Sequence, residues 1–143
     1  MVRTELDALP MEEKTGLPYA STAKQTTAAG RETFVAHSCG HDIHMASWVG
    51  AARALMALKA QWHGTLMFIG QPAEESAGGP EDMIADKMFE RFGKTDMGFA
   101  LHVGGDTAAG QVSYKAGWSR PVRIPSPYSS TGAEAMVPCR APR

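Results

Sequence analysis

The sequence predicts an α/β fold with a partial, mostly parallel sheet flanked by helices. Two observations indicate this class. Apolar runs of strand length alternate along the chain with segments of helical periodicity, and the clearest of these runs is bounded by glycine. The length of 143 residues suits one domain, and no internal repeat divides it.

Two segments are predicted to be helices. The longer covers about 42–59, where apolar residues recur at steps of three and four: Ile43, Trp48, Ala52, Leu55 and Met56. We interpret Trp48 and the nearby methionines as core residues. The shorter helix covers 80–92, where Pro80 suits the first helical position and Glu81 and Asp82 are favourable in the first turn.

Three apolar runs are predicted to be strands, over 64–71, 96–103 and 110–116. The first, GTLMFIGQ, is a continuous apolar run of the kind found in strands buried on both faces. Segment 1–21 contains acidic residues and turn formers, and we expect no full strand there. Segment 120–143 carries five prolines and four arginines, and we expect an irregular tail without regular secondary structure.

Charge and composition exclude several classes of partner. The formal net charge of −1 gives no reason to expect nucleic acid or an anionic membrane as partner. No apolar run is long enough to cross a bilayer, and the N-terminus does not resemble a signal peptide, so we expect a cytoplasmic protein. The two cysteines, Cys39 and Cys139, do not suggest a disulfide framework.

Potential metal ligands gather in the segment AHSCGHDIHMA, residues 36–46. Thiolate and imidazole are both good ligands for zinc and related divalent metals, and Cys39 and His41 supply one of each. Gly40 between them lets the backbone turn so that both side chains can face one centre. The segment therefore predicts a metal site.

Further polar groups follow the predicted strands. Glu74 and Glu75 come shortly after the strand that ends at Gln71, and His102 lies near the end of the next strand. Ligands of open α/β sheets bind beyond the carboxyl ends of the strands, so these groups should converge with the segment around Cys39. Adjacent carboxylates point in different directions, so one can bind a metal while the other handles a proton.

The residue pattern alone leaves other interpretations open. The sulfur of Cys39 could instead be a nucleophile activated by His37 or His41. The paired glutamates could belong to a solvated loop, and His102 could be a core histidine. The remaining histidines are expected at the surface or beside a ligand rather than as ligands: His37, His44 and His63.

Four segments together resemble the amidohydrolase branch of the dinuclear metallopeptidases: ELDALPMEEKTGLPYAS, HSCGHDIHMA, GTLMFIGQPAEES and GFALHVGGDTAAGQVSYKAGWS. That branch includes hippurate hydrolases, N-acyl-amino-acid hydrolases and auxin-conjugate hydrolases. The segments follow the family's order from about Arg3 to Ser119. The resemblance implies that residues 1–119 form part of a metallohydrolase catalytic domain.

The resemblance also implies a site with two divalent metal ions, Zn²⁺ or Mn²⁺. The implied ligands are Cys39, which bridges the ions, and His41, Glu75 and His102. Glu74 would be the general base, and Asp7 would orient a ligand histidine. Glu5 stands where the family more often has aspartate, and its role stays open.

The implied reaction is metal-assisted hydrolysis of the amide bond in N-acyl amino acids or related small substrates. The ions would lower the pKa of a bound water, and Glu74 would take its proton and pass it to the leaving amine. The alternative is an inactive fragment or pseudoenzyme with residual metal binding, because this chain lacks the family's lid domain and its last metal-ligating histidine. The sequence therefore leaves open whether this chain is an enzyme.

Two further hypotheses concern the parts that the resemblance does not cover. Read from the third base of each codon, residues 131–143 can encode a GGHGA motif of the family's lid, so we hypothesise a frameshift near residues 118–120. Sequencing the encoding DNA tests this hypothesis. The missing neighbours would also leave sheet edges and apolar faces exposed, which predicts self-association or a homodimer.

Overall fold

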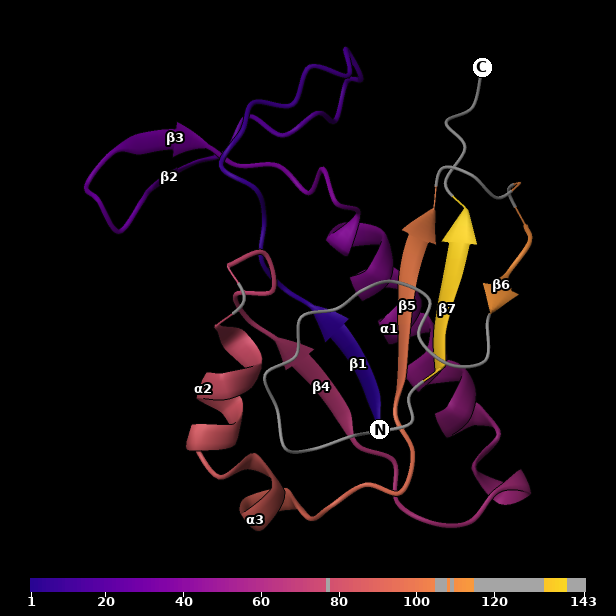
Figure 1. The fold of residues 1–143 in the computed structure, drawn as a ribbon. Coiled ribbons are helices and arrows are strands. Elements are labelled where there is room, and N and C mark those ends of the chain that lie inside the picture. Colours follow the sequence, from indigo (N-terminus) through magenta and orange to yellow (C-terminus); the bar gives the residue numbers. More distant parts are fainter. Residues whose placement is uncertain (77, 105–107, 109, 115–132, 139–143) are drawn as a thin grey trace.

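A five-stranded sheet forms the centre of the computed structural model, which describes residues 1–76, 78–104, 108, 110–114 and 133–138 (Figure 1). The strands are β1 (Val2–Glu5), β4 (Phe68–Gln71), β5 (Phe99–Gly104), β6 (Ser113–Tyr114) and β7 (Ala133–Pro138). Their order is β4-β1-β5-β7-β6, and every pairing is parallel except that of β6 with β7. The predicted α/β class with a mostly parallel sheet is confirmed.

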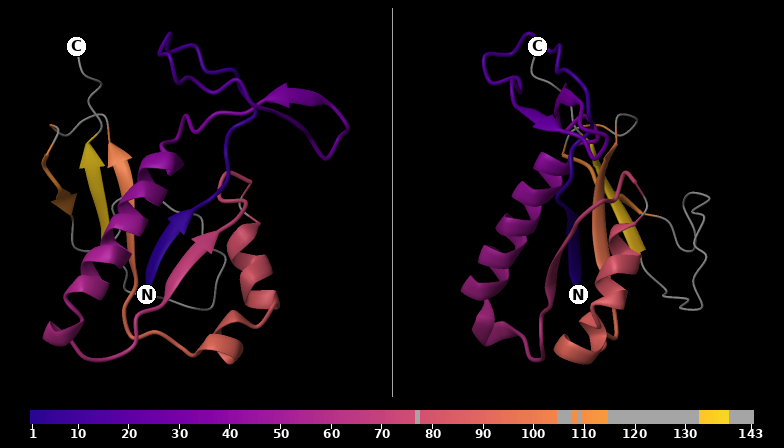
Figure 2. Two further views of the ribbon diagram at one scale, coloured as in Figure 1. Left: turned by 180° about the vertical axis from the view of Figure 1, so that it is seen from behind. Right: turned by 90° about the vertical axis from the view of Figure 1, so that its left-hand side faces the viewer.

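Helices lie on both faces of this sheet. Helix α1 (His41–Ala57) packs on β1 and β5, whereas α2 (Gly79–Ala85) and α3 (Met88–Phe92) lie on the opposite side (Figure 2). A short 3-10 helix, η1 (Lys59–Gln61), follows α1.

The apolar face of α1 is anchored to the sheet by Trp48. Its indole N–H donates a hydrogen bond to the Val2 carbonyl (3.2 Å), and its ring packs edge-on against Phe68 at 5.3 Å. The interpretation of the neighbouring methionines as core is wrong for Met56, which is 67% exposed in the last turn of α1.

The predicted elements differ from the observed ones mainly in their bounds. The helix expected over 80–92 is two helices, because Lys87 adopts a left-handed conformation (φ 59°) between α2 and α3. The predicted strands at 64–71 and 96–103 begin only at Phe68 and Phe99. Of the third, 110–116, only Ser113–Tyr114 is a strand, and residues 115 and 116 lie outside the described part.

Strand β1 was not expected, because its sequence VRTE has neither an apolar run nor a clear alternation. It nevertheless pairs with β4 on one side and β5 on the other, and this central place buries Thr4 and Glu5 to 1% and 2% exposure. The hairpin of β2 (Lys24–Thr26) and β3 (Glu32–Phe34) was also missed. It stands away from the main sheet (Figure 1).

The expectation of an irregular tail over 120–143 is wrong for Ala133–Pro138, which form β7. These six residues pair in parallel with Phe99–Gly104 of β5. An open strand edge offers unpaired backbone donors and acceptors, so pairing can form a strand where the local sequence shows no period. The rest of that range and the site of the proposed frameshift lie outside the described residues.

Large apolar side chains stay accessible around β5. Met97 and Phe99 are 66% and 54% exposed. The expected self-association stays a prediction, which these side chains favour. Among the described residues, no helix is both long and apolar enough for a membrane span.

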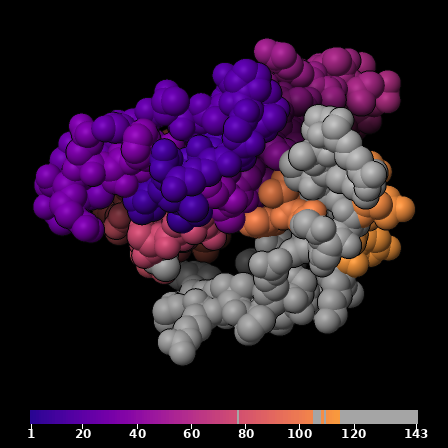
Figure 3. Space-filling view, turned by 90° about the horizontal axis from the view of Figure 1, so that it is seen from above, coloured from indigo at the N-terminus to yellow at the C-terminus, as the bar shows by residue number. Residues whose placement is uncertain are grey.

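The fold brings several chain segments to one edge of the sheet. Strands β1, β4 and β5 run in parallel, so their carboxyl ends meet there, and α1 begins at the same edge (Figure 1). Seen from above, the segments that follow β1 lie across this edge, with β5 beside them (Figure 3). The candidate ligands are therefore close together in the fold, because each lies near the end of one of these strands or at the start of α1.

Candidate metal centre

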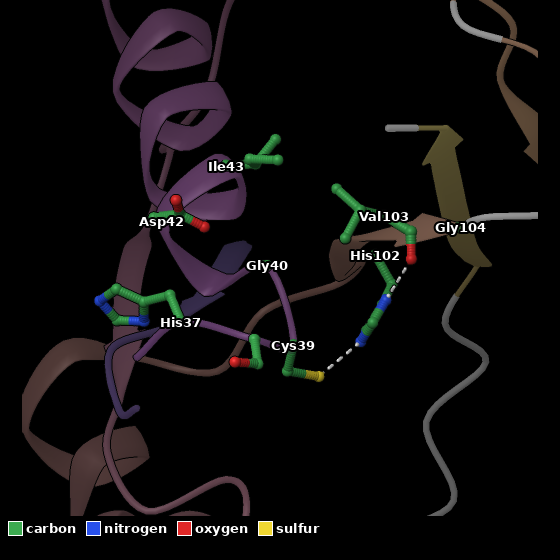
Figure 4. Close-up of a pocket in the computed structure, with 9 residues that line it drawn as sticks. His37, Cys39, Gly40, Asp42, Ile43, His102, Val103 and Gly104 are labelled. Atoms are coloured by element: carbon green, nitrogen blue, oxygen red, sulfur yellow. Dashed lines mark hydrogen bonds between the residues drawn. The ribbon is translucent and has the colours of Figure 1, made fainter. Parts of the chain in front are cut away.

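The Cys39-Gly40-His41 turn leads into α1 and depends on its glycine. Gly40 caps the helix in the left-handed conformation, with φ 85°, which glycine adopts without steric cost. A Cβ at this position would also lie 2.4 Å from Cγ2 of Val103. The turn therefore brings the start of α1 against the end of β5, with Cys39 directly before this contact (Figure 4).

We expect Gly40→Ala to lower the free energy of unfolding by about 2–4 kcal/mol, because it adds backbone strain and a clash with Val103. The measurement is urea unfolding followed by circular dichroism. Gly50→Ala is the matched control: Gly50 lies within α1, and a Cβ there meets no described atom within 4 Å. The control should stabilise the chain by about 0.5–1 kcal/mol. Equal effects of the two changes would contradict the prediction.

His41 is buried (1% exposed) and presents an unpaired nitrogen. Its Nδ1 lies 2.8 Å from the Asp7 carbonyl oxygen. A carbonyl only accepts, so Nδ1 carries the proton and Nε2 is left with a lone pair. Within the described part of the chain Nε2 has no hydrogen-bond partner.

Two carboxylates face this nitrogen. The Oε2 atom of Glu74 and the Oε1 atom of Glu75 lie 3.7 and 3.8 Å from His41 Nε2. A buried lone pair surrounded by anions is costly unless a cation or a donor is placed between them. The surroundings of His41 therefore fit a metal ion.

Cys39 and His102 complete the arrangement. The Cys39 Sγ atom lies 3.4 Å from Nε2 of His102, while Nδ1 of His102 donates to the Val103 carbonyl at 2.7 Å (Figure 4). His102, like His41, thus turns its Nε2 lone pair inward. Ligand atoms of Cys39, His41 and Glu75 all lie within 4.8 Å of one another. One thiol, imidazoles and a carboxylate form a donor set suited to zinc and related metals.

A cavity of about 480 Å³ opens beside Cys39 and His102, lined by residues 37–40, 42, 43 and 102–104. The close-up shows the Cys39 sulfur directed toward His102 and the ring of His37 turned away from it (Figure 4). His37 is half-buried, and its Nδ1 is buried without a hydrogen-bond partner among the described residues, whereas His63 is exposed. The cavity gives a small molecule access to the sulfur side of the site.

The thiol of Cys39 has a pKa raised from 9.0 to about 11. Burial is the largest cause, followed by the hydrogen bond to Glu75 and the negative charges of Glu75, Glu74 and Glu5. A cysteine nucleophile needs the opposite, a lowered pKa. The raised pKa therefore disfavours the interpretation of Cys39 as a nucleophile.

We expect iodoacetamide to alkylate Cys39 slowly at pH 8 in the folded, metal-free chain. A pKa about two units above that of a free thiol leaves roughly 100-fold less thiolate, the reactive form. Mass spectrometry of a Cys139→Ser chain, which leaves one thiol, measures the rate. The same chain in urea is the control and should react at the rate of an ordinary cysteine. Equal rates in both conditions would contradict the raised pKa.

The turn after β4 holds Glu75 against Asp7. Ala73 has a left-handed backbone (φ 50°), and a Cβ at Gly79 would lie 1.6 Å from the Pro72 carbonyl oxygen, so the turn is tightly closed. The backbone N–H of Glu75 donates to the Asp7 carboxylate at 2.9 Å. Asp7 thus contacts both sides of the site, His41 through its carbonyl and Glu75 through its carboxylate.

A second cluster of candidate ligands, formed by Glu5, His41 and His44, is a polar network rather than a metal site. His44 is 2% exposed; its Nδ1 donates to Glu5 at 2.9 Å, and its Nε2 accepts the Val103 N–H at 2.9 Å. Both nitrogens are therefore used, and no lone pair is left for a metal. The Glu5 carboxylate also pairs with Arg3 at 2.6 Å.

The pKa of Glu5 is set by opposing effects. Burial alone raises it, but the hydrogen bond from His44 and the charge of Arg3 outweigh burial, so the pKa lies below its ordinary value of 4.5. Sequence reasoning left the role of Glu5 open and expected His44 at the surface or beside a ligand. The signal for His44 was its spacing, since a residue three positions after His41 lies on the same helix face.

Comparisons with known proteins agree with this geometry. Residues 1–140 match the family described as Peptidase family M20/M25/M40. The chain is 40% identical over 115 residues to an N-acetyldiaminopimelate deacetylase of Oceanobacillus iheyensis, covering 80% of this chain and 28% of the relative. It is 36% identical over 139 residues to an N-acetyl-L-cysteine deacetylase of Bacillus subtilis, covering 96% of this chain and 30% of the relative.

A solved structure shares the fold. The chain matches the crystal structure of the Bacillus subtilis YXEP protein, described as a dinuclear metal binding peptidase from the M20 family, with a TM-score of 0.68 and 35% identity. The match covers 81% of this chain and 29% of that one. This chain therefore spans less than a third of the length of the relatives that it matches.

Proposed function

Because the chain belongs to the peptidase family M20/M25/M40, we propose that it carries metal-binding residues of an enzyme that hydrolyses the amide bond of N-acyl amino acids. The observation that carries the proposal is the buried, unpaired Nε2 of His41, which faces Glu74 and Glu75. Relatives named as deacetylases of N-acetyldiaminopimelate and N-acetyl-L-cysteine support this substrate class. A cytoplasmic location stays a prediction from the sequence.

In this proposal the divalent ions would be held by Cys39, His41, Glu75 and His102. Zn²⁺ suits a thiolate with imidazole and carboxylate, and Mn²⁺ is the second candidate. The chemistry that such ions supply when bound is polarisation of the amide carbonyl and acidification of a water molecule.

Glu74 is the proposed general base. Its Oε2 atom lies 3.7 Å from His41 Nε2 and so borders the ligand cluster, yet ligand atoms of Cys39 and His41 group with Glu75 instead. A carboxylate that borders a metal site without ligating can accept a proton from water and deliver it to the leaving amine. Asp7 supports this geometry by holding both the His41 ring and the Glu75 backbone.

A second candidate function is metal binding without hydrolysis. The described residues group three ligand side chains, those of Cys39, His41 and Glu75, and place His102 beside Cys39. Two ions with tetrahedral coordination need more than these four ligands even when one of them is shared. In this case the chain would bind one ion and leave amide substrates intact.

Metal titration of the purified 143-residue chain tests the proposal. Elemental analysis and Zn²⁺ titration of the wild type should show at least one bound ion, and Cys39→Ala and His102→Ala should each weaken binding strongly. His63→Ala is the control, because His63 is exposed and follows the C-terminal end of α1, whereas Cys39 and His41 stand at the start of this helix. A folded wild-type chain that binds no ion would overturn the proposal. Binding without release of acetate from N-acetyl amino acids would favour the second candidate.

A further inference from the structure

We propose that His44 is a positioning residue: it fixes the end of β5 so that His102 keeps its Nε2 turned toward Cys39. The role of His102 as a ligand rests on the proposed function, whereas its orientation can be tested without a metal. His44 itself has no free nitrogen with which to ligate.

Hydrogen bonds to both ring nitrogens fix the position of His44. The Glu5 carboxylate accepts from Nδ1 at 2.9 Å, which fixes the proton on Nδ1. Nε2 is therefore an acceptor, and it receives the Val103 backbone N–H at 2.9 Å. His44 and Glu5 are both buried, so water does not compete for these bonds.

The contact at Val103 bears directly on His102. His44 holds the Val103 N–H, and the Val103 carbonyl accepts the Nδ1–H of His102 at 2.7 Å. The rings of His44 and His102 also meet edge-to-face at 4.7 Å. Removing His44 would free the Val103 backbone, whose carbonyl fixes the proton on Nδ1 of His102. It would also remove the ring that packs against His102.

The network continues to the strand that precedes the paired glutamates. Arg3 pairs with Glu5 at 2.6 Å and donates from Nε to the Gln71 side chain at 2.7 Å. Gln71 is the last residue of β4, and Glu5 is the last of β1. A single chain of polar contacts therefore joins the ends of β4, β1 and β5, from which the candidate ligands project.

Two substitutions separate the contacts of His44. An asparagine amide lies near the place of Nδ1, so His44→Asn can keep the bond to Glu5 but not the one to Val103. A glutamine oxygen reaches the place of Nε2, so His44→Gln can keep the bond to Val103. His63→Asn is the matched control on an exposed histidine. Circular dichroism of each full-length variant checks that the fold is retained.

The first measurement uses the metal-free chain. Long-range ¹H–¹⁵N spectra of the His102 ring report which nitrogen carries the proton. We expect the Nδ1–H tautomer in the wild type, in His44→Gln and in His63→Asn, and a mixture of tautomers in His44→Asn. A wild-type tautomer in the His44→Asn chain, or the same mixture in both His44 variants, would overturn the inference.

The second measurement is Co²⁺ titration followed by the visible absorption of the bound ion. We expect His44→Asn to weaken binding by about 10–100-fold, the usual effect of losing a group that orients a ligand, and His44→Gln to weaken it only a few-fold. Measurable Co²⁺ binding of equal affinity in all chains would overturn the inference. A wild type that binds no Co²⁺ but shows the expected tautomers would overturn the proposed function and leave the positioning role supported.

Discussion

Replacing Glu5 by alanine should lower the free energy of unfolding by about 3 kcal/mol, the scale expected when one partner of a buried ion pair is removed. The carboxylate is 2% exposed and pairs with Arg3 and His44, so its loss leaves a buried imidazole N–H without an acceptor and a guanidinium without its counterion. Urea unfolding of the full-length chain, followed by circular dichroism, measures the change.

Glu12→Ala provides the control for this prediction. Glu12 also forms an ion pair, with Lys14 at 3.4 Å, but the side chains are 50% and 78% exposed. An exposed pair contributes between zero and about 1 kcal/mol, so the control should change stability little. If Glu5→Ala and Glu12→Ala lowered the free energy of unfolding by the same small amount, the contacts of Glu5 would not stabilise the fold as proposed.

The same network predicts how stability depends on pH. The pKa of Glu5 is lower in the folded chain than its ordinary value of 4.5. At pH values between the folded and the unfolded pKa, the unfolded chain therefore binds more protons than the folded chain. The stabilisation is therefore complete above the unfolded pKa and is lost as the pH falls through the folded pKa. Urea unfolding at a series of pH values should show Glu5→Gln approaching the wild type in acid. If the wild type and Glu5→Gln differed by the same free energy of unfolding at every pH, the predicted loss of stabilisation in acid would be contradicted.

The parts of the fold that the sequence could predict are those with a long local signal. Helix α1 is seventeen residues of steady periodicity, and its observed bounds, His41–Ala57, lie within two residues of the prediction. Strands β4 and β5 carried apolar runs. In contrast, β1 spans four residues with two polar side chains buried, and only its two neighbouring strands make it central.

The candidate site was predictable for a different reason. Each ligand candidate stands at the end of a strand or the start of a helix, and parallel strands bring such ends together. The sequence could not predict the hydrogen bonds that position the ligand residues. The bonds of His44 to Glu5 and Val103 join residues 39 and 59 positions apart, and no local pattern encodes such pairs.

Replacing Glu75 by alanine should weaken Zn²⁺ binding by more than the roughly 10–100-fold that loss of an outer partner costs, because it removes a ligand itself. The two neighbouring glutamates lie at nearly equal distances from His41 Nε2, 3.7 Å for Glu74 and 3.8 Å for Glu75. Of the two, Glu75 is the one that groups with Cys39: ligand atoms of Cys39, His41 and Glu75 lie within 4.8 Å of one another. Calorimetric titration of the full-length chain measures the affinity.

Glu74→Ala is the matched variant, since it removes the same chemical group one position away. It should leave Zn²⁺ affinity within about tenfold of the wild type, because a general base contributes to proton transfer rather than to coordination. The side chains of Glu74 and Glu75 are 37% and 28% exposed, so neither change should unfold the chain, and loss of metal reports on coordination directly. The reverse order of affinities would exchange the two roles: Glu74 would become the ligand and Glu75 the base.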